Sequence, residues 1–250
     1  MALRAHLETA AGMARSMVVY YGQPWRRRAL RRFYQALISP DDLVFDIGAH
    51  AGSRSKTLLS LGAKVVAVEP QPAFADLIEK HFAGQLAGFE RVAVGARPGE
   101  VSLRISRRHP TVTTTSPDFV EKVGRTDGFR QVRWDSEVVV PMTTLDLLIE
   151  RYGIPDFCKI DCEGAEADIL SGLSRPLKLV AFEYIPAMPS VAEKAIDVLM
   201  ALGNYRFNRV IGESHQFHWT DWQDGTHLRR DLAALGPESG SGDIYARLEC

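Results

Sequence analysis

The chain has 250 residues and is 46% hydrophobic, which is enough to bury the core of one large domain. Its 30 basic and 31 acidic residues leave a formal net charge of −1, so no overall field attracts nucleic acid or a membrane, although a local patch could. No apolar run reaches the ~18 residues of a spanning helix, and Arg15 with its polar neighbours interrupts any signal-peptide core. We therefore expect a cytoplasmic protein without a membrane span and without a nucleic-acid partner.

Three cysteines are present, Cys158, Cys162 and Cys250, and none belongs to a Cys-x-x-Cys pair. We expect reduced thiols in a reducing compartment. Cys158 lies inside an apolar run and is expected to be a small buried hydrophobic residue.

The N-terminal region, residues 3–38, carries apolar side chains at mixed spacings of three and four, which predicts helix. Gly22, Pro24 and Trp25 mark a break, and we treat residues 1–40 as an N-terminal helical extension. Five arginines follow the break: Arg26, Arg27, Arg28, Arg31 and Arg32. They fit the solvated face of a helix; alternatively, they form a docking patch for an anionic substrate or membrane surface, with Trp25 as its anchor.

Short apolar runs alternate with helix-length segments after residue 41, which favours a mostly parallel sheet covered by helices on both faces. Strands are expected at residues 43–47, 64–69, 89–94, 101–105, 137–140, 157–161, 177–184, 205–211 and 242–248. Helices are expected at residues 53–61, 70–82, 143–152, 165–170 and 191–202, with a threonine cap at residue 143 or 144. Residues 215–237 are ambiguous. The last strand is expected at an edge of the sheet, where it can run antiparallel.

Residues 106–136 are long for a connection inside a compact domain. We interpret them as an insertion into the domain of residues 41–250 that serves as a substrate loop. The strand after the insertion is expected to pair with residues 101–105.

Four of the expected strands end in an acid: Asp46, Glu69, Asp161 and Glu183. The carboxyl ends of parallel strands share one edge of a sheet, and ligands bind there. Each acid alone could cap the next helix. Four together predict that at least three line a ligand site.

The glycine spacing after the first strand narrows the choice of ligand. A dinucleotide fingerprint reads G-x-G-x-x-G, whereas this chain has Gly48-x-x-x-Gly52 with His50 between and Asp46 before the turn. An acid at that place is a poor neighbour for a pyrophosphate and a good one for a cation. Glu69, 23 residues after Asp46, is placed to accept hydrogen bonds from ribose hydroxyls. The pattern favours S-adenosylmethionine over a nicotinamide dinucleotide.

Several blocks of the sequence together resemble the FkbM family of methyltransferases. They are Phe45-Asp46-Ile47-Gly48-Ala49-His50-Ala51-Gly52, Val68-Glu69-Pro70, Thr144-Leu145-Asp146, Lys159-Ile160-Asp161-Cys162-Glu163-Gly164-Ala165-Glu166 and Gly242-Asp243-Ile244-Tyr245-Ala246. The resemblance covers roughly residues 41–248 and implies the seven-stranded, Rossmann-like methyltransferase fold. It also implies S-adenosylmethionine as donor and O-methylation of a sugar, glycan or polyketide-type hydroxyl. His50 stands where the family usually has Asn, and residues 106–136 follow no transferable pattern.

The resemblance and the strand-end geometry assign roles to individual residues. The residues expected to bind the donor are Asp46, Gly48, Ala49, His50, Gly52, Glu69, Pro70, Ala93, Val94 and Asp161. In this scheme the glycines admit the methionine part, Asp46 lies near its ammonium group directly or through water, Glu69 holds the ribose, and residues 92–94 border the adenine.

The expected catalytic residues are Glu163 and Asp161, with Glu163 preferred as general base because Asp161 could be tied to the cofactor. His50 and His109 are the alternatives for that role. Helix capping is the competing interpretation of Glu163 and Glu166. Carboxylates at this edge could ligate a metal, but their spacing does not demand one, and no metal is expected.

Other functions remain open at this point. A nucleic-acid or protein methyltransferase is disfavoured, because Asp161-Cys162-Glu163-Gly164 replaces the amine-methylating Asn/Asp-Pro-Pro-Tyr signature and the net charge is near neutral. A methyltransferase of non-carbohydrate small molecules, a dinucleotide-binding oxidoreductase and a non-catalytic binding module are the remaining alternatives. The sequence gives no oligomeric state.

Overall fold

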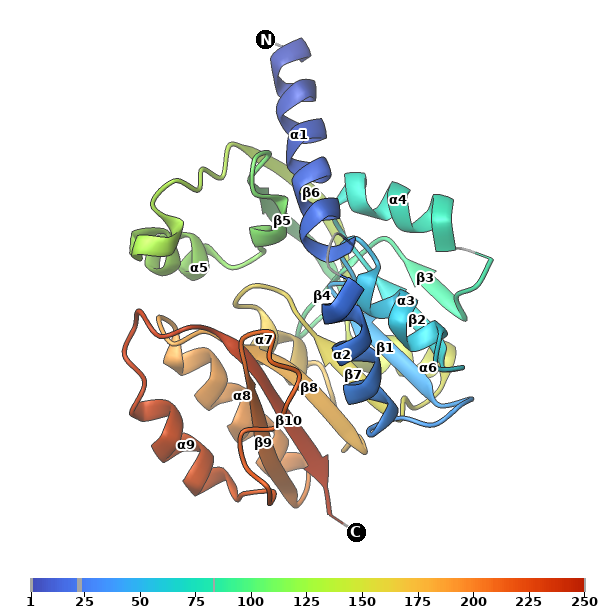
Figure 1. Cartoon of the computed structure of the whole chain (residues 1–250), viewed down its shortest axis with the longest axis vertical. Coiled ribbons are helices and arrows are strands. Elements are labelled where there is room, and N and C mark those ends of the chain that lie inside the picture. The colour runs from blue at the N-terminus through green and yellow to red at the C-terminus, as the bar shows by residue number, and fades with distance from the viewer. Residues whose placement is uncertain (1, 22–23, 83, 250) are drawn as a thin grey trace.

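A seven-stranded sheet with the order β3-β2-β1-β7-β8-β10-β9 forms the centre of the protein (Figure 1). This computed structural model describes residues 2–21, 24–82 and 84–249. The strands are β1 (Leu43–Ile47), β2 (Lys64–Val68), β3 (Gly88–Glu90), β7 (Phe157–Ile160), β8 (Leu179–Tyr184), β9 (Tyr205–Ile211) and β10 (Gly242–Leu248). β10 alone runs antiparallel to its neighbours, β8 and β9. The expected mostly parallel α/β sheet with an antiparallel last strand is confirmed. The expected edge position of that strand is wrong, because β10 lies between β8 and β9 and pairs with both.

Helices cover both faces of the main sheet (Figure 1). They are α3 (Ser53–Leu59), α4 (Pro72–Phe82), α6 (Leu145–Tyr152), α7 (Glu166–Ser171), α8 (Pro189–Leu202) and α9 (Gly225–Ala233). One face packs against α6, α7 and α8 through residues such as Leu148, Ile169 and Ile196. The opposite face packs against α3 through Leu58. The fold is therefore doubly wound, and the strands between the two helix layers are buried along almost their whole length, as in β1.

A second, three-stranded sheet stands beside the first, with the order β4-β6-β5. Its strands are β4 (Ala93–Val94), β5 (Gly99–Ile105) and β6 (Ser136–Thr143). The expected pairing of residues 101–105 with the strand after the insertion is confirmed, with Val101 opposite Val140.

The single strand expected at residues 89–94 is wrong. The chain leaves the main sheet after Glu90, whose carboxylate accepts a hydrogen bond from the Tyr152 hydroxyl at 2.6 Å. Arg91 then turns outward and pairs with Asp76 at 2.6 Å and Glu79 at 3.0 Å. Residues 93–94 therefore belong to the second sheet, paired in parallel with β6.

The insertion of residues 106–136 has a small core of its own. It contains η1 (Pro110–Val112), α5 (Pro117–Lys122), η2 (Val123–Arg125) and η3 (Asp127–Phe129). Phe119, Val123 and Val132 are buried together with Met188 from the segment before α8. The insertion is thus packed onto the main domain beside the carboxyl ends of its strands.

The N-terminal region forms two helices, α1 (Ala2–Tyr21) and α2 (Pro24–Gln35). The break that the sequence predicts includes Gly22, which lies outside the described residues. Pro24 and Trp25, expected in the break, are instead the first two residues of α2. α2 packs on the sheet through Tyr34, which is 1% exposed and lies 5.8 Å from the Phe157 ring. α1 projects from the body (Figure 1) and contacts the insertion near Arg107 through Gly12.

Two further expectations can be compared with the described residues. Cys158 is a buried free thiol and Cys162 is a partly buried one, whereas Cys250 lies outside them. Among the described helices none combines the length and the apolar character that crossing a bilayer requires.

Candidate active site

A cavity opens at the carboxyl ends of β1, β2 and β7. The main sheet contributes Ile47, Val68, Asp161 and the turns that follow. Of the residues expected to bind the donor, the cavity is lined by Gly48, His50, Glu69, Pro70, Ala93, Val94 and Asp161. Asp46, Ala49 and Gly52 do not line it. Of the four strand-end acids only Glu69 and Asp161 line this cavity, so the expectation of at least three at one site is wrong: Asp46 is buried beneath the turn, and Glu183 lines a neighbouring cavity. The strand-end geometry therefore brings most of the expected residues to one place.

The turn after β1 needs glycine at two positions for reasons of packing. Gly48 has φ +79°, and a Cβ there would lie 2.0 Å from the Asp161 carbonyl oxygen. Gly52 has φ +73°, and a Cβ there would lie 2.8 Å from the Phe82 ring. Both backbones are in the left-handed region that glycine adopts at no steric cost. The glycines let the turn approach β7 and α4 closely, whether or not they also approach the methionine part.

His50 occupies a left-handed position in the same turn, with φ +49°. Asn and His are enriched among the non-glycine residues that adopt this conformation. The imidazole lies 3.7 Å from the Phe74 ring, centroid to centroid. Burial lowers the pKa of His50 to about 3, with Asp161 opposing and Arg54 adding to the shift. The ring is therefore neutral near pH 7, and its predicted role as an alternative base remains a prediction.

Asp46 is buried beneath the turn, with 1% of its surface exposed. Its carboxylate accepts a hydrogen bond from the Ser55 hydroxyl at 2.5 Å. This bond ties the end of β1 to the first turn of α3. The contact of Asp46 with an ammonium group stays a prediction.

Glu69 directly follows β2, lines the cavity and holds two turns together by hydrogen bonds. Its two carboxylate oxygens accept backbone hydrogen bonds from His50 and Gln71, each at 2.7 Å. Burial raises the pKa of Glu69 to about 7, although both hydrogen bonds oppose the shift. Each oxygen keeps a further lone pair that can accept a hydroxyl proton. Glu69 is thus placed to bind a diol such as a ribose.

Asp161 follows β7 and is held between two cations. Arg54 lies at 3.0 Å and Lys159 at 3.7 Å. Burial alone would raise the pKa of Asp161, but Lys159 and Arg54 outweigh it and hold the pKa below its ordinary value. The fully buried Lys159 also donates a hydrogen bond to Asp243 at 2.9 Å. Asp161 is therefore ionised, and its negative charge is already compensated.

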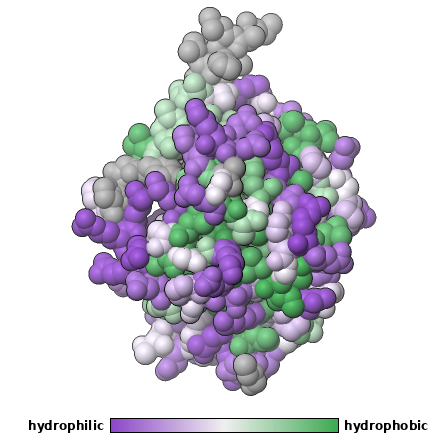
Figure 2. Space-filling model, turned by 90° about the vertical axis from the view of Figure 1, so that its right-hand side faces the viewer, coloured by the Kyte–Doolittle hydropathy of each residue, from purple (hydrophilic) through white to green (hydrophobic). Residues whose placement is uncertain are grey.

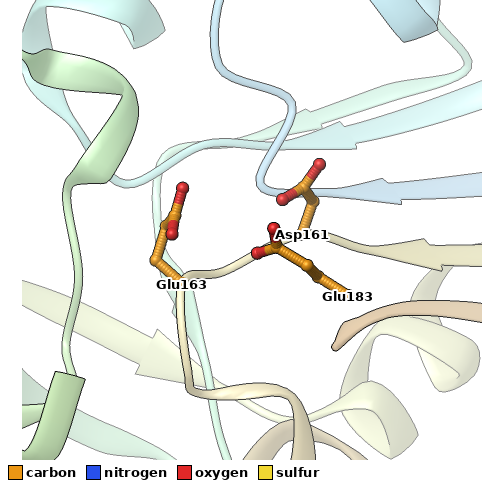
Figure 3. Close-up of side chains that lie close together, drawn as sticks. All are labelled: Asp161, Glu163 and Glu183. Carbon is orange, nitrogen blue, oxygen red and sulfur yellow. The ribbon is translucent and has the colours of Figure 1, made fainter. Parts of the chain in front are cut away.

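Two further carboxyl groups face Asp161, from Glu163 in the same loop and from Glu183 on β8 (Figure 3). The three groups offer oxygen atoms that lie within 4.8 Å of one another. Burial raises the pKa of Glu163 well above its ordinary value, and Asp161 and Glu166 add to the effect. Glu183 is shifted in the same direction, by burial and then by Glu163. The cluster holds one ionised and two protonation-prone carboxyl groups.

The comparisons with known proteins decide the family. Residues 46–238 match the family model described as the methyltransferase FkbM domain. The chain belongs to the FkbM methyltransferase family. It is therefore a methyltransferase, as the sequence motifs indicated, and the dinucleotide-binding oxidoreductase alternative is wrong.

Two relatives share about a quarter of their aligned residues with the chain. A hexuronic acid methyltransferase, AglP of Haloferax volcanii, is 24% identical over 204 residues, 78% of each protein. The 2-O-methyltransferase NoeI of Sinorhizobium fredii strain NGR234 is 25% identical over 162 residues, which are 62% of this chain and 66% of NoeI. An O-methyltransferase from Bacillus cereus, solved with S-adenosylhomocysteine, has a TM-score of 0.50 at 13% identity, covering 98% of this chain and 90% of that one. This last likeness confirms the methyltransferase fold.

The insertion of this FkbM protein closes the cavity with threonines that the sequence did not single out. Thr111, Thr113, Thr114 and Thr115 all line it. The Thr114 hydroxyl donates a hydrogen bond to the Glu163 carbonyl oxygen at 2.7 Å, which joins the insertion to the loop after β7. His109, the other alternative base, accepts a hydrogen bond from Arg15 at 2.9 Å and lines a different cavity.

Arg54 is the charged cavity residue that the sequence prediction missed. It lies in the first turn of α3, where the helix dipole disfavours a cation. From the sequence, this unfavourable position could have indicated that Arg54 has an anionic partner. Glu166, in contrast, has a structural role at the start of α7. It is buried and accepts backbone hydrogen bonds from Cys162 and Gly164 at 3.0 Å.

Proposed function

We propose that this FkbM protein transfers a methyl group from S-adenosylmethionine to a hydroxyl group of a sugar or glycan. The supporting observation is the cavity lined by Glu69, Asp161 and Glu163, the last two of which form a carboxyl cluster with Glu183. The relative names support the acceptor class: one relative acts on a hexuronic acid, and the other is a 2-O-methyltransferase.

S-adenosylmethionine is the methyl donor, and the residues of the cavity fit it. Ile47, Val68, Ala93 and Val94 offer an apolar surface for a purine ring. Glu69 has free lone pairs for the ribose hydroxyls. The cationic lining residue Arg54 is paired with a carboxylate, so the cavity favours a ligand with positive charge over one with phosphates.

The donor supplies a methyl group on a positively charged sulfur, which is already an activated electrophile. The chain must hold the acceptor oxygen in line and remove its proton. We assign proton removal to Glu163. The new bond joins the acceptor oxygen to the methyl carbon, the sulfur–carbon bond breaks, and the hydroxyl proton moves to the Glu163 carboxylate.

Asp161 is the weaker candidate for the base. Its lowered pKa, caused by Lys159 and Arg54 against the opposing effect of burial, makes it a poor proton acceptor. Burial raises the pKa of Glu163 well above its ordinary value, with Asp161 and Glu166 adding to the effect, so its carboxylate is a stronger base than that of Asp161. Asp161 then acts as a fixed negative charge beside the reacting methyl group.

Binding and turnover test the proposal separately. Calorimetry should detect S-adenosylhomocysteine binding to the purified full chain and no binding of NAD. A radiolabelled methyl group should then appear in an acceptor from a panel of glycosides. Donor binding without turnover of any hydroxyl acceptor would favour a non-catalytic binding module instead.

A further inference from the structure

A second cavity adjoins the donor cavity at Glu163. Glu163 lines both. The other walls come from the insertion, from the loop that precedes α8 and from residues 237–241 before β10. In Figure 1 the insertion with α5 lies across from these two loops. A molecule in this space would lie against the proposed base, which also lines the donor cavity.

We propose that this second cavity binds the acceptor and selects a sugar unit that carries no anionic group. The proposal rests on the proposed function, because it identifies the acceptor of that reaction.

The acidic side chains that line the cavity select against an anionic acceptor. Three glutamates line the cavity, Glu163, Glu183 and Glu238, and no lysine, arginine or histidine does so among the described residues. A carboxylate or phosphate on the acceptor would be buried beside these glutamates with no cationic side chain to compensate its charge, and burial of an unpaired charge is unfavourable. An uncharged sugar instead presents hydroxyl donors to carboxyl oxygens.

One oxygen in the cavity lacks a partner that such a hydroxyl would supply. Oε2 of Glu183 is buried and has no hydrogen-bond partner among the described residues. Buried polar atoms in native proteins are rarely left unpaired, and such an atom calls for an explanation. A sugar hydroxyl bound beside Glu163 would donate to it. Phe129, Ile185 and Pro186 provide the apolar wall against which the C–H face of a pyranose can pack.

A third cavity offers a contrast that strengthens the assignment. It is lined by Arg15 and His109, and it adjoins the donor cavity through Pro110 and Thr111. An anionic sugar would suit these cations, but none of the three clustered carboxyl groups lines this cavity. An acceptor bound there would lack the base that the reaction requires.

The test compares matched pairs of 4-nitrophenyl hexosides and hexuronides in the gluco, galacto and manno series. The two members of a pair differ only in oxidation at C6. We expect at least one hexoside to be methylated with a kcat/KM at least ~10-fold above that of its hexuronide. Calorimetry with S-adenosylhomocysteine is run on the same sample.

Blocking the cavity provides the second arm. Gly240 lines it, has no heavy atom within 4 Å of an added Cβ and is not in the left-handed region. Gly240→Trp should therefore fold and bind S-adenosylhomocysteine like wild type, while KM for the hexoside rises at least ~10-fold. Gly84→Trp is the matched control, because Gly84 has the same open surroundings and lines none of the three cavities.

The outcomes separate the two proposals. A hexuronide used as well as its hexoside, turnover of neither, or a Gly240→Trp variant with unchanged KM each overturns the acceptor assignment. Failure to bind S-adenosylhomocysteine instead contradicts the proposed function itself.

Discussion

Four carboxyl groups at the ends of β2, β7 and β8 differ in protonation because their neighbours differ. Asp161 lies between Arg54 and Lys159 and keeps its charge. Glu163 and Glu183 are buried beside that charge and resist ionisation. Neighbouring acids whose pKa values are driven apart are the arrangement from which acid and base roles are assigned. The chemistry of the site is therefore set by two cations that touch one carboxylate and not the others.

Replacement of Glu163 by Gln tests the base. The amide cannot take the hydroxyl proton, so we expect kcat to fall at least ~100-fold while affinity for S-adenosylhomocysteine is kept. Glu121→Gln is the control, because Glu121 is exposed on α5 and pairs with Arg125 at 3.0 Å. Near-normal turnover by Glu163→Gln would exclude Glu163 and leave Asp161 and His50 as the cavity-lining alternatives.

The pH dependence of wild-type turnover should have an acid limb that belongs to Glu163. The active form is the carboxylate, so the rate rises with pH until Glu163 is ionised. Because burial and Asp161 raise the pKa of Glu163, this limb lies above the pH range of an ordinary glutamate. A rate profile that is already flat at pH 5 would contradict the assignment.

Glu69 should make the ligand-free protein more stable in mild acid. Its folded-state pKa, raised by burial to about 7, lies above the ordinary 4.5. Its contribution is fully present below that ordinary value and is lost as pH rises to about 7, by an amount on the order of 3 kcal/mol. Denaturant unfolding at several pH values should show this slope in wild type and a smaller one in Glu69→Gln. Glu79→Gln, which alters an exposed ion pair with Arg91, should keep the wild-type slope.

We expect that the carboxyl cluster holds no tightly bound metal ion that methyl transfer requires. The clustered oxygens are close enough to bind a cation, but Arg54 and Lys159 already neutralise Asp161. We expect methyl transfer to survive dialysis against EDTA unchanged. A loss that added Mg²⁺ or Mn²⁺ restores would assign a metal to Asp161, Glu163 and Glu183.

Helices and strands whose limits depend on neighbouring residues could be predicted from local sequence patterns. β1 was predictable as an apolar run that ends in an acid and a glycine turn, and the hydroxyl of Thr144 caps α6 by accepting a hydrogen bond from the Leu147 N–H at 3.2 Å. The helix α9 was missed although Asp224 caps it by the same mechanism, accepting from the His227 N–H at 2.8 Å. Its flanking aromatic and polar residues obscured that signal.

Elements that depend on distant partners were not predictable from one sequence. The strand expected at residues 89–94 divides because Arg91 pairs with α4 and residue 93 pairs with Met142. The same holds for the site. Its strand-end acids follow from the sheet, whereas the threonines of the insertion enter the cavity through tertiary contacts such as that of Thr114 with the Glu163 backbone.

The contact of α1 with the insertion gives a prediction at this scale. A Cβ at Gly12 would lie 2.1 Å from the Arg107 carbonyl oxygen, which backbone atoms cannot accommodate without moving. We expect Gly12→Leu to separate α1 from the insertion and to accelerate tryptic cleavage after Arg107 and Arg108. Ala11→Leu, at an exposed position of the same helix, should leave the cleavage rate unchanged. Equal cleavage of both variants would mean that α1 does not protect the insertion.

The whole molecule divides its charge unevenly along the chain. Residues 1–35 contain seven arginines and one glutamate, a formal charge of +6, so the remaining residues carry −7. The arginines of α2 are exposed, as is Trp25 with 67% of its surface. Hydrophilic side chains predominate on the face seen in Figure 2, with hydrophobic ones between them. A near-neutral total charge therefore conceals a basic N-terminal region on an acidic body.

This asymmetry predicts that the N-terminal region binds anionic surfaces. Each basic residue near such a surface contributes about 1 kcal/mol, so replacing Arg26, Arg27 and Arg28 together by Ser should weaken binding to vesicles that contain phosphatidylserine more than ~100-fold. Sedimentation with these vesicles and with phosphatidylcholine alone measures the effect, and added salt should weaken wild-type binding as screening increases. Arg125→Ser, in an exposed ion pair of the insertion, should bind like wild type. If the triple variant binds as tightly as wild type, or if wild type binds both kinds of vesicle equally well, the arginines form only a solvated helix face.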